Sequence, residues 1–92
     1  MRGVEFDADT AREASDFEEV IFNYSLTPEQ AYDMFGEDQM SVGKRLYFAE
    51  KMPLDRATIL LLLDPDDRIR QVVEARLKES REKENGGLVI TA

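Results

Sequence analysis

Two groups of closely spaced aspartates are the candidates for chemistry in this chain: Asp64, Asp66 and Asp67, and Asp7 with Asp9. Converging carboxylates can bind hard cations or carry out acid–base hydrolysis. The Asp-Pro-Asp-Asp stretch lacks the sixth-position glycine and the distal glutamate of a calcium loop, and no glycine-rich oxyanion loop accompanies it. Acids in a first helical turn interact favourably with the helix dipole. We therefore expect helix starts, no metal site and no catalytic residue.

The chain contains no cysteine and no histidine. It therefore offers no disulfide, no thiolate nucleophile and no sulfur ligand for zinc or an iron–sulfur cluster. It also lacks the side chain that most often acts as general base or metal ligand near neutral pH. These compositional features exclude most enzyme mechanisms, and we expect a protein without catalytic activity and without a cofactor.

The net charge of −8 is distributed unevenly along the chain. Residues 1–43 carry eleven acidic side chains against Arg2 and Arg12, whereas residues 44–92 carry nine acidic side chains against ten basic ones. This balance argues against direct binding of nucleic-acid phosphates. No run is long and apolar enough to cross a membrane, and residues 1–10 lack the apolar stretch of a secretory signal. We therefore expect a cytoplasmic protein.

Capping residues divide the chain into about five helices. Thr10 with Glu13, and Thr27 with Gln30, have the spacing of a capping box, and Ser41 can cap a further helix. Apolar residues recur at helical spacing between these positions. They predict an all-α domain of residues 1–84 with helices over 11–23, 28–35, 41–51, 54–63 and 65–84. After a break at Asn85, we expect residues 85–92 to form a flexible or β-prone tail.

The densest apolar run, residues 59–63, is apolar on every side of a helix, which predicts a buried element. Asp64 and Pro65 then turn the chain, with Asp64 as the cap of the next helix and Pro65 at its first position. We expect residues 52–77 to form a helical hairpin on which the rest of the chain packs. The predicted core draws on every helix: Phe17, Val20, Ile21, Ala31, Phe35, Leu46, Leu60, Leu63, Ile69, Val73 and Leu77.

Residues 27–49 and 52–76 share one plan: a helix that starts at a proline, a turn that contains an aspartate, and a second helix. Asp38 matches Asp64 and Leu46 matches Val73, which gives a period of about 26 residues. The plan is typical of a helical repeat. Two copies are fewer than the three or so that bury a continuous core, so the first helix must act as a cap or a partner must complete the stack.

Residues 62–77, LLDPDDRIRQVVEARL, resemble the turn and second helix of a HEAT-like repeat. The short period and the spaced prolines, Pro28 and Pro53, are similar to those of the variant leucine-rich repeat. The resemblance covers about residues 27–77 and implies a small stack of two degenerate repeats with an N-terminal capping helix. It also implies a structural pairing of Asp64 with Arg70, and a binding function. The first copy departs from this pattern, because Gly43 occupies the position in the first copy that Arg70 occupies in the second.

The first function that the sequence suggests is a small regulatory or adaptor module that binds another protein through the open end of its stack. An acidic first helix would attract a partner with a basic surface. Aromatic side chains beside the apolar faces lie in the core or form contacts at such an end. The candidate contact residues are Asp9, Glu13, Asp16, Glu19, Tyr32 and Tyr47. A second copy of this chain is the other occupant that the sequence leaves open.

The second function is an acidic nucleic-acid mimic, an inhibitor of the phage or mobile-element type that occupies the basic site of a DNA- or RNA-binding enzyme. In this hypothesis the acids of residues 7–19 imitate phosphates. A mimic needs acids on one outward face without basic partners inside the protein. The alternatives are a solvated acidic face, or a first helix packed beside the protein's own basic residues Arg68, Arg70, Arg76 and Arg81.

Overall fold

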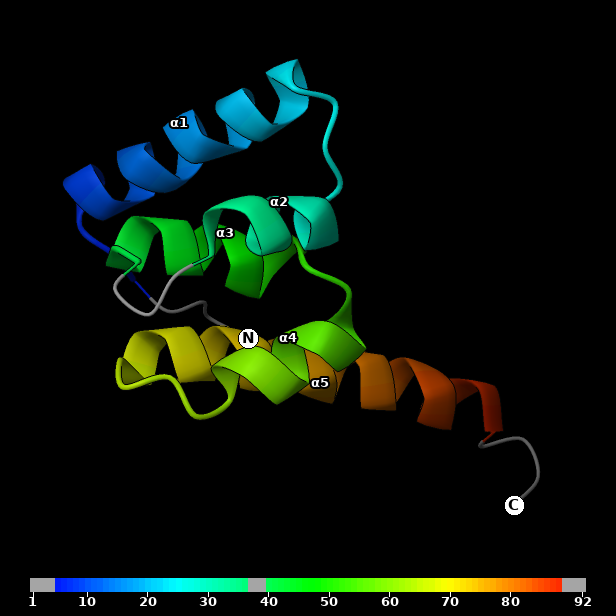
Figure 1. Ribbon diagram of the computed structural model, residues 1–92. Helices are drawn as coiled ribbons and strands as arrows, with labels where there is room; N and C mark the ends of the chain where they lie inside the picture. Colours follow the sequence, from blue (N-terminus) through cyan, green and yellow to red (C-terminus); the bar gives the residue numbers. More distant parts are fainter. Residues whose placement is uncertain (1–4, 37–39, 89–92) are drawn as a thin grey trace.

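Residues 5–36 and 40–88 are described by the computed structural model, and within them the protein is all-α, as predicted. None of these helices is long and apolar enough to cross a membrane. The residues of the predicted first-copy turn at Asp38, and residues 89–92 of the predicted tail, lie outside the described ranges. The predicted break at Asn85 is wrong, because α5 continues through residues 85–88, which were expected in the tail. Five helices follow one another along the chain (Figure 1): α1 (Ala8–Asn23), α2 (Pro28–Phe35), α3 (Val42–Lys51), α4 (Leu54–Leu61) and α5 (Asp67–Leu88).

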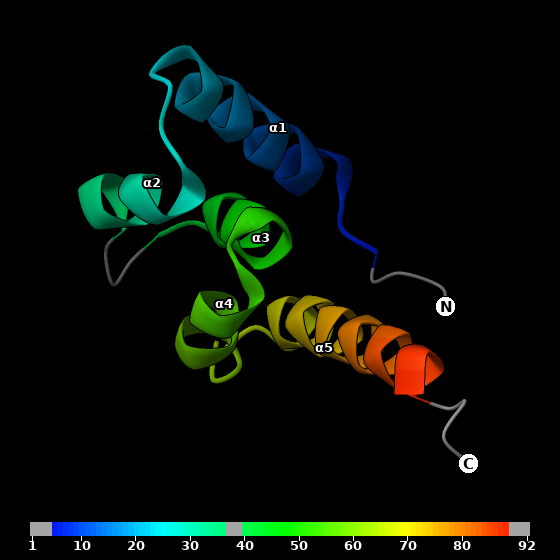
Figure 2. The ribbon, with the colours of Figure 1, turned by 90° about the vertical axis from the view of Figure 1, so that its right-hand side faces the viewer.

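The helices lie in three layers, with α1 above the pair α2 and α3, and that pair above α4 and α5 (Figure 1). In the view turned by 90°, α1, α3 and α5 lie above one another on one side, and α2 lies above α4 on the other (Figure 2). Helix α3 packs against all four other helices. The rest of the chain therefore packs on α3, and the expectation that residues 52–77 form the organising element is wrong.

Two of the predicted helix starts are confirmed by their hydrogen bonds. At α2, the backbone N–H of Gln30 donates to Thr27 Oγ1 at 3.1 Å, and the N–H of Thr27 donates to Gln30 Oε1 at 2.9 Å. This is a complete capping box, and it satisfies two backbone donors at once. At α3, Ser41 Oγ accepts from the N–H of Lys44 at 3.4 Å.

The start of α1 lies earlier than predicted. The helix begins at Ala8, and Asp7 occupies the N-cap position. Thr10 Oγ1 donates to Asp7 Oδ1 at 2.5 Å, so the threonine holds the cap residue and is not itself the cap. This hydrogen bond lowers the pKa of Asp7.

The start of α5 lies later than predicted, because the helix begins at Asp67 and the residue before it, Asp66, supplies the cap. Asp66 Oδ1 accepts from the N–H of Arg68 at 2.8 Å. Asp64 Oδ1 instead accepts from the N–H of Asp66 at 2.9 Å, which closes the turn between α4 and α5. Asp64 is therefore a turn residue and not the predicted helix cap.

The core is aromatic and is centred on Phe48 of α3. Its ring meets Phe17, Tyr32 and Tyr47 edge to face, with centroids 5.5, 5.0 and 5.2 Å apart. Phe17 also lies 6.0 Å from Phe35, which joins α1 to α2. Most of the predicted core is confirmed as buried: Phe17, Ile21, Ala31, Leu46, Ile69 and Val73. The predicted core residues Phe35, Leu60 and Leu77 are partly buried.

The prediction that residues 59–63 are buried on every side is wrong. Leu61 is buried, but Ile59 is 73% exposed and Leu63 is 89% exposed. Helix α4 packs on α3 and α5, and within the described part of the chain no other element packs substantially on it, which leaves its outer face in contact with solvent. Val20, also predicted in the core, is exposed because it lies off the stripe that α1 presents to α3.

Gly43 allows α1 to lie close to α3. It is buried, and a Cβ atom at this position would lie only 2.6 Å from the Cβ of Glu13. A larger side chain would therefore force the two helices apart. The close approach also brings Glu13 Oε2 to 2.7 Å from Ser41 Oγ, which donates a hydrogen bond to it.

Candidate interaction surface

The four acidic residues predicted to contact a partner are all exposed on α1, but they differ in their surroundings. Asp9 pairs with Arg12 at 3.3 Å, and Glu13 accepts the hydrogen bond from Ser41. Asp16 and Glu19 make no ion pair with any residue that the structure describes. The acidic face therefore keeps two carboxylates without a partner in the described ranges.

Helix α1 does not pack beside the basic residues of α5, because α3 lies between the two helices (Figure 2). The basic partner of α1 comes instead from the end of α3, where Lys51 Nζ lies 3.5 Å from Glu18 Oε2. Arg68 at the start of α5 lies over the ring of Phe6, 4.9 Å from its centroid. The alternative that the acidic helix packs against the arginines of α5 is therefore wrong.

The two tyrosines predicted to contact a partner lie in or beside the core. Tyr47 is only 4% exposed, and its burial raises the pKa of the phenol. Tyr32 is half-buried, and its ring packs on Phe48. Tyr47 therefore has no surface to offer a partner, and Tyr32 offers part of one edge.

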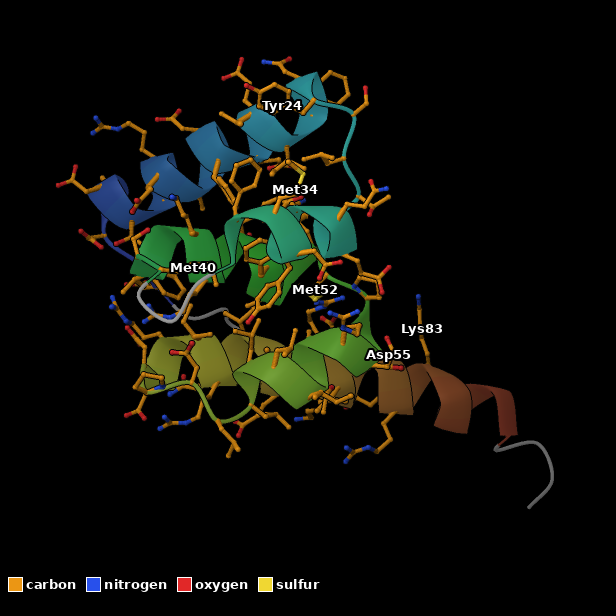
Figure 3. All side chains as sticks on the ribbon, viewed as in Figure 1. Tyr24, Met34, Met40, Met52, Asp55 and Lys83 are labelled. Atoms are coloured by element: carbon orange, nitrogen blue, oxygen red, sulfur yellow. The ribbon has the colours of Figure 1, made fainter. Side chains whose placement is uncertain are left out.

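A different group of apolar side chains is exposed on α1 and α2. Phe22 and Tyr24 lie at the C-terminal end of α1, Met34 lies near the end of α2, and they are 78%, 66% and 63% exposed. Figures 1 and 2 both show this end of α1 over α2, and Figure 3 labels Tyr24 and Met34 in this region. We call these three residues the corner patch.

The turn after α1 holds the corner patch in place. Leu26 N–H donates to the Ile21 carbonyl at 3.1 Å, and Ser25 N–H donates to the Phe22 carbonyl at 2.9 Å. Together with a φ of 57° at Ser25, these bonds form a Schellman motif, in which the residue after the cap is left-handed. The motif directs Leu26 and Ile21 inward, and it leaves Phe22 and Tyr24 outside.

The predicted contact set did not include the corner patch, because the aromatic residues placed in it were Tyr32 and Tyr47. A usable signal was present, since the buried residues of α1 are Ala14, Phe17 and Ile21 at helical spacing. Phe22 directly follows one of them and falls outside this stripe. An aromatic residue beside a complete apolar stripe is a candidate for the surface.

Exposed acidic residues lie close to the corner-patch residues in the sequence. Glu18 and Glu19 precede Phe22 by four and three residues, which places them next to it on the helix surface. Asp33 is exposed and precedes Met34 in α2. The corner therefore combines exposed aromatic and methionine side chains with a negatively charged rim.

The aspartates between α4 and α5 are held by arginines. The Asp64 side chain is 4% exposed, and its Oδ2 lies 2.8 Å from Arg45 Nε. The N–H of Arg45 Nε is not aligned for a hydrogen bond, so the contact is an ion pair. Arg70, the residue that the repeat resemblance pairs with Asp64, donates to the Asp64 main-chain oxygen at 2.5 Å. The Asp64 carboxylate thus joins this turn to α3 through Arg45.

The neighbouring aspartate forms a two-point ion pair. Arg68 Nε and Nη2 donate to the Asp66 carboxylate at 3.1 and 2.9 Å, and these bonds lower the pKa of Asp66 to about 2. Over residues 5–36 and 40–88, no three acidic side chains converge as they would around a metal ion. The clustered aspartates of residues 7–9 and 64–67 are thus engaged in caps, turns and ion pairs.

Comparisons of this chain with known protein families, curated proteins and solved structures found no match. The features that bear on function are those of the surface itself. They are the acidic side of α1 and the corner patch at its C-terminal end.

Proposed function

We propose that this protein is a small interaction module without catalytic activity, and that it binds another protein through the corner patch. The observation that carries this proposal is the exposure of Phe22 and Tyr24 at the C-terminal end of α1 and of Met34 near the end of α2, the next helix. Clustered aromatic and methionine side chains are enriched at protein interfaces, where their burial supplies much of the binding energy.

The proposed partner presents apolar side chains within a basic rim. Glu19 lies next to Phe22 on the helix surface, Asp33 precedes Met34, and Asp16 extends the negative charge along α1, whereas Glu18 pairs with Lys51. These acids would accelerate the encounter with a positively charged surface. A second copy of this chain is disfavoured at the corner, because it would bring two acidic rims together.

We also propose that α2–α3 and α4–α5 are two degenerate helical repeats capped by α1. Their layered arrangement supports this, with α1, α3 and α5 on one side and α2 above α4 on the other (Figure 2). The outward side of α5 carries exposed Gln71, Glu74 and Lys78. Because this last helix is polar on its outer side, the proposed contact lies at the corner and not at the end of the stack.

Nucleic-acid mimicry fits the acids of α1 less well. A mimic needs outward carboxylates that are free of internal partners. Asp9 pairs with Arg12, Glu18 with Lys51, and Glu13 accepts a hydrogen bond from Ser41. These contacts support a structural use of part of the acidic face.

The test compares the wild-type protein with Phe22→Ser and Met34→Ser variants. Affinity capture from the source cells at low salt identifies candidate partners, and calorimetry with the purified partner then measures affinity. We expect each substitution to weaken binding about tenfold or more, the effect of losing an interface hot spot. The matched control is Ile59→Ser, which changes an equally exposed apolar residue on α4 and should leave binding unchanged.

The salt dependence is a second measurement. Association should slow as ionic strength rises, because exposed charges are screened beyond about 8 Å at physiological salt. Dissociation should stay nearly constant, because it depends on the apolar contact. The proposal fails if no partner is retained at low salt, or if Ile59→Ser weakens binding as much as Phe22→Ser does.

A further inference from the structure

Helix α4 lies at the edge of the molecule, beside α5 and below α2 and α3 (Figure 2), and its outer side carries apolar side chains. Ala57 and Leu61 are its buried residues, on the side that packs on α3 and α5. Ile59 lies on the opposite side of the helix and is 73% exposed. The backbone of Leu62 keeps a helical conformation, so Leu63 continues the same side one turn later, where it is 89% exposed. We call Ile59 and Leu63 the α4 stripe.

Opposite charges lie at the two ends of the α4 stripe. Asp55 is exposed one turn before the stripe, and it makes no ion pair with any side chain that the structure describes. At the other end, Arg70 Nη1 donates to the main-chain oxygen of Asp64 at 2.5 Å, which places the guanidinium beside the residue that follows Leu63. This guanidinium also pairs with the exposed Asp67, and it keeps further N–H groups for a second carboxylate. An acid therefore precedes the stripe and a base follows it.

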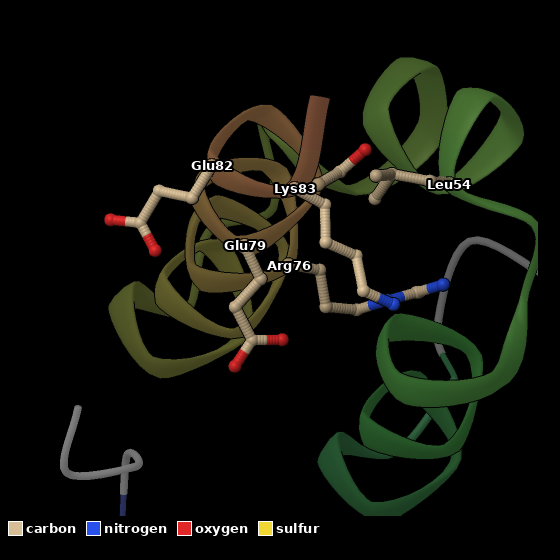
Figure 4. Close-up of a pocket in the computed structure, with 6 residues that line it drawn as sticks. Leu54, Arg76, Glu79, Glu82 and Lys83 are labelled. Atoms are coloured by element: carbon tan, nitrogen blue, oxygen red, sulfur yellow. The ribbon is translucent and has the colours of Figure 1, made fainter. Parts of the chain in front are cut away.

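The charges around α4 are balanced, unlike those of the first two helices. Residues 54–83 carry seven acidic and seven basic side chains, whereas residues 5–36 carry nine acidic side chains and one basic one. The balance extends to the depression of about 600 Å³ between Leu54 and α5. Its charged lining consists of two acidic and two basic side chains (Figure 4): Glu79, Glu82, Arg76 and Lys83. Repulsion between two copies of this chain is therefore weaker on the side of α4 than on the side of α1 and α2.

We propose that a second copy of this chain covers the α4 stripe and forms a two-fold symmetric dimer. In a two-fold contact, each pair of residues forms twice, with the roles of the two copies exchanged. With the two α4 helices antiparallel, Ile59 of each copy meets Leu63 of the other, and each Asp55 reaches the Arg70 that lies beside that Leu63. The α4 surface is thus complementary to itself in apolar contact and in charge. A basic partner, the kind proposed for the corner patch, finds no excess of acid here.

The proposed dimer is weak, and its response to salt differs from that of the partner complex. The eight residues of α4 span only about 12 Å. This is short for the roughly 1,200–2,000 Å² that a stable interface buries, so we expect a dissociation constant on the order of 100 µM. Each copy carries a net charge of −8, so added salt should strengthen the dimer by screening the repulsion between copies. Association with a basic partner at the corner patch should instead slow.

Sedimentation velocity of the purified protein, from about 10 µM to about 1 mM, tests the proposal. The wild type should shift from monomer to dimer over this range. Leu63→Ser should raise the dissociation constant about tenfold or more, because each dimer buries two copies of this side chain. The matched control is Phe22→Ser, which removes a similarly exposed apolar side chain from α1 and should leave the dimer unchanged. Both changes alter exposed side chains, and equal melting temperatures would show that the fold is retained.

Asp55→Asn tests the charged contact and should weaken the dimer by up to about fivefold, the upper range for an exposed ion pair. Asp16→Asn, which removes an exposed carboxylate from α1, is its control and should not weaken the dimer. If the two variants act equally, the antiparallel arrangement is wrong.

Three results would overturn the dimer itself: a wild type that stays monomeric at about 1 mM, equal weakening by Phe22→Ser and Leu63→Ser, or a dimer that weakens as salt rises. Binding of the corner-patch partner is measured separately, so either proposal can fail alone. Loss of that binding in Leu63→Ser but not in Phe22→Ser would mean that a different protein, and not a second copy, covers the α4 stripe.

Discussion

Helices α3 and α4 show that burial does not follow the apolar content of a helix. Helix α3 carries four charged residues among ten, yet Leu46, Tyr47, Phe48 and Ala49 are all buried. Helix α4 leads into the leucine run, yet only Ala57 and Leu61 are buried in it. The difference is in their neighbours, since α3 packs on four helices and α4 mainly on two.

The charged residues of α3 are compatible with its central position because most of them have a partner. Arg45 pairs with Asp64, and Lys51 pairs with Glu18. Lys44 lies over the ring of Phe17, with Nζ 5.5 Å from the centroid. Charged residues in a central helix are thus compatible with burial when surrounding helices supply counter-charges or aromatic faces.

The largest expected effect is the loss of the central aromatic ring. Phe48→Ala should lower the free energy of unfolding by about 3–5 kcal/mol, because it removes a fully buried ring and leaves a cavity. Ile59→Ala should change it by less than about 0.5 kcal/mol, because that side chain is largely in solvent. Urea unfolding followed by circular dichroism measures both.

Phe48→Leu provides a milder substitution if the alanine variant does not fold, and it should still destabilise the protein more than Ile59→Ala does. Similar losses for the α3 and α4 variants would contradict the central position of α3 and the exposure of α4.

A smaller effect is expected at the ion pair that joins α3 to the turn after α4. Asp64→Ala should cost about 2–3 kcal/mol, because it leaves Arg45 largely buried without its counter-charge. Pro65→Ala, at the neighbouring exposed position, should cost less than about 0.5 kcal/mol. Thermal unfolding compares the two, and equal losses would mean that the turn matters more than the ion pair.

The sequence predicted the local structure well, because local structure depends on local chemistry. Thr27 with Gln30, and Ser41, mark helix starts through hydrogen bonds to residues three positions away, so their spacing alone identifies them. Asp64 and Thr10 carry the carboxylate and hydroxyl side chains that are typical of helix N-caps. Their assignment failed because nearby aspartates, Asp66 and Asp7, take the cap position instead.

The sequence did not predict which helix faces are covered, because that depends on distant elements. Nothing in the leucine run indicates that only one side of α4 is packed. The corner patch was missed for the same reason, since Phe22 and Met34 resemble core residues until α1 and α2 are placed. The acidic residues of α1 were correctly expected at the surface by their type, whereas Tyr47 was placed in the contact set although its neighbours enclose it.

The smallest effect is the contribution of Asp66, at the start of α5, to the pH dependence of stability, which tests this end of the molecule separately from the central helix. Asp66 has a pKa of about 2 in the folded protein, below its ordinary value of 3.8, because Arg68 binds its carboxylate. The unfolded chain therefore binds more protons between these values, and stability rises with pH there. The stabilisation from this carboxylate is fully present above pH 3.8 and is lost as the pH falls towards 2.

Asp66→Asn should remove this contribution, so the difference in melting temperature between the wild type and the variant should shrink as the pH falls from about 4 to about 2. Glu74→Gln serves as the control for loss of an exposed carboxyl on α5. Because Asp66 also caps α5 through the N–H of Arg68, asparagine retains part of the cap, and the remaining difference isolates the charge. A difference that stays constant over this range would show that the Asp66 carboxylate does not stabilise the turn through its ion pair, and the hydrogen bond to the backbone would then account for the role of this residue.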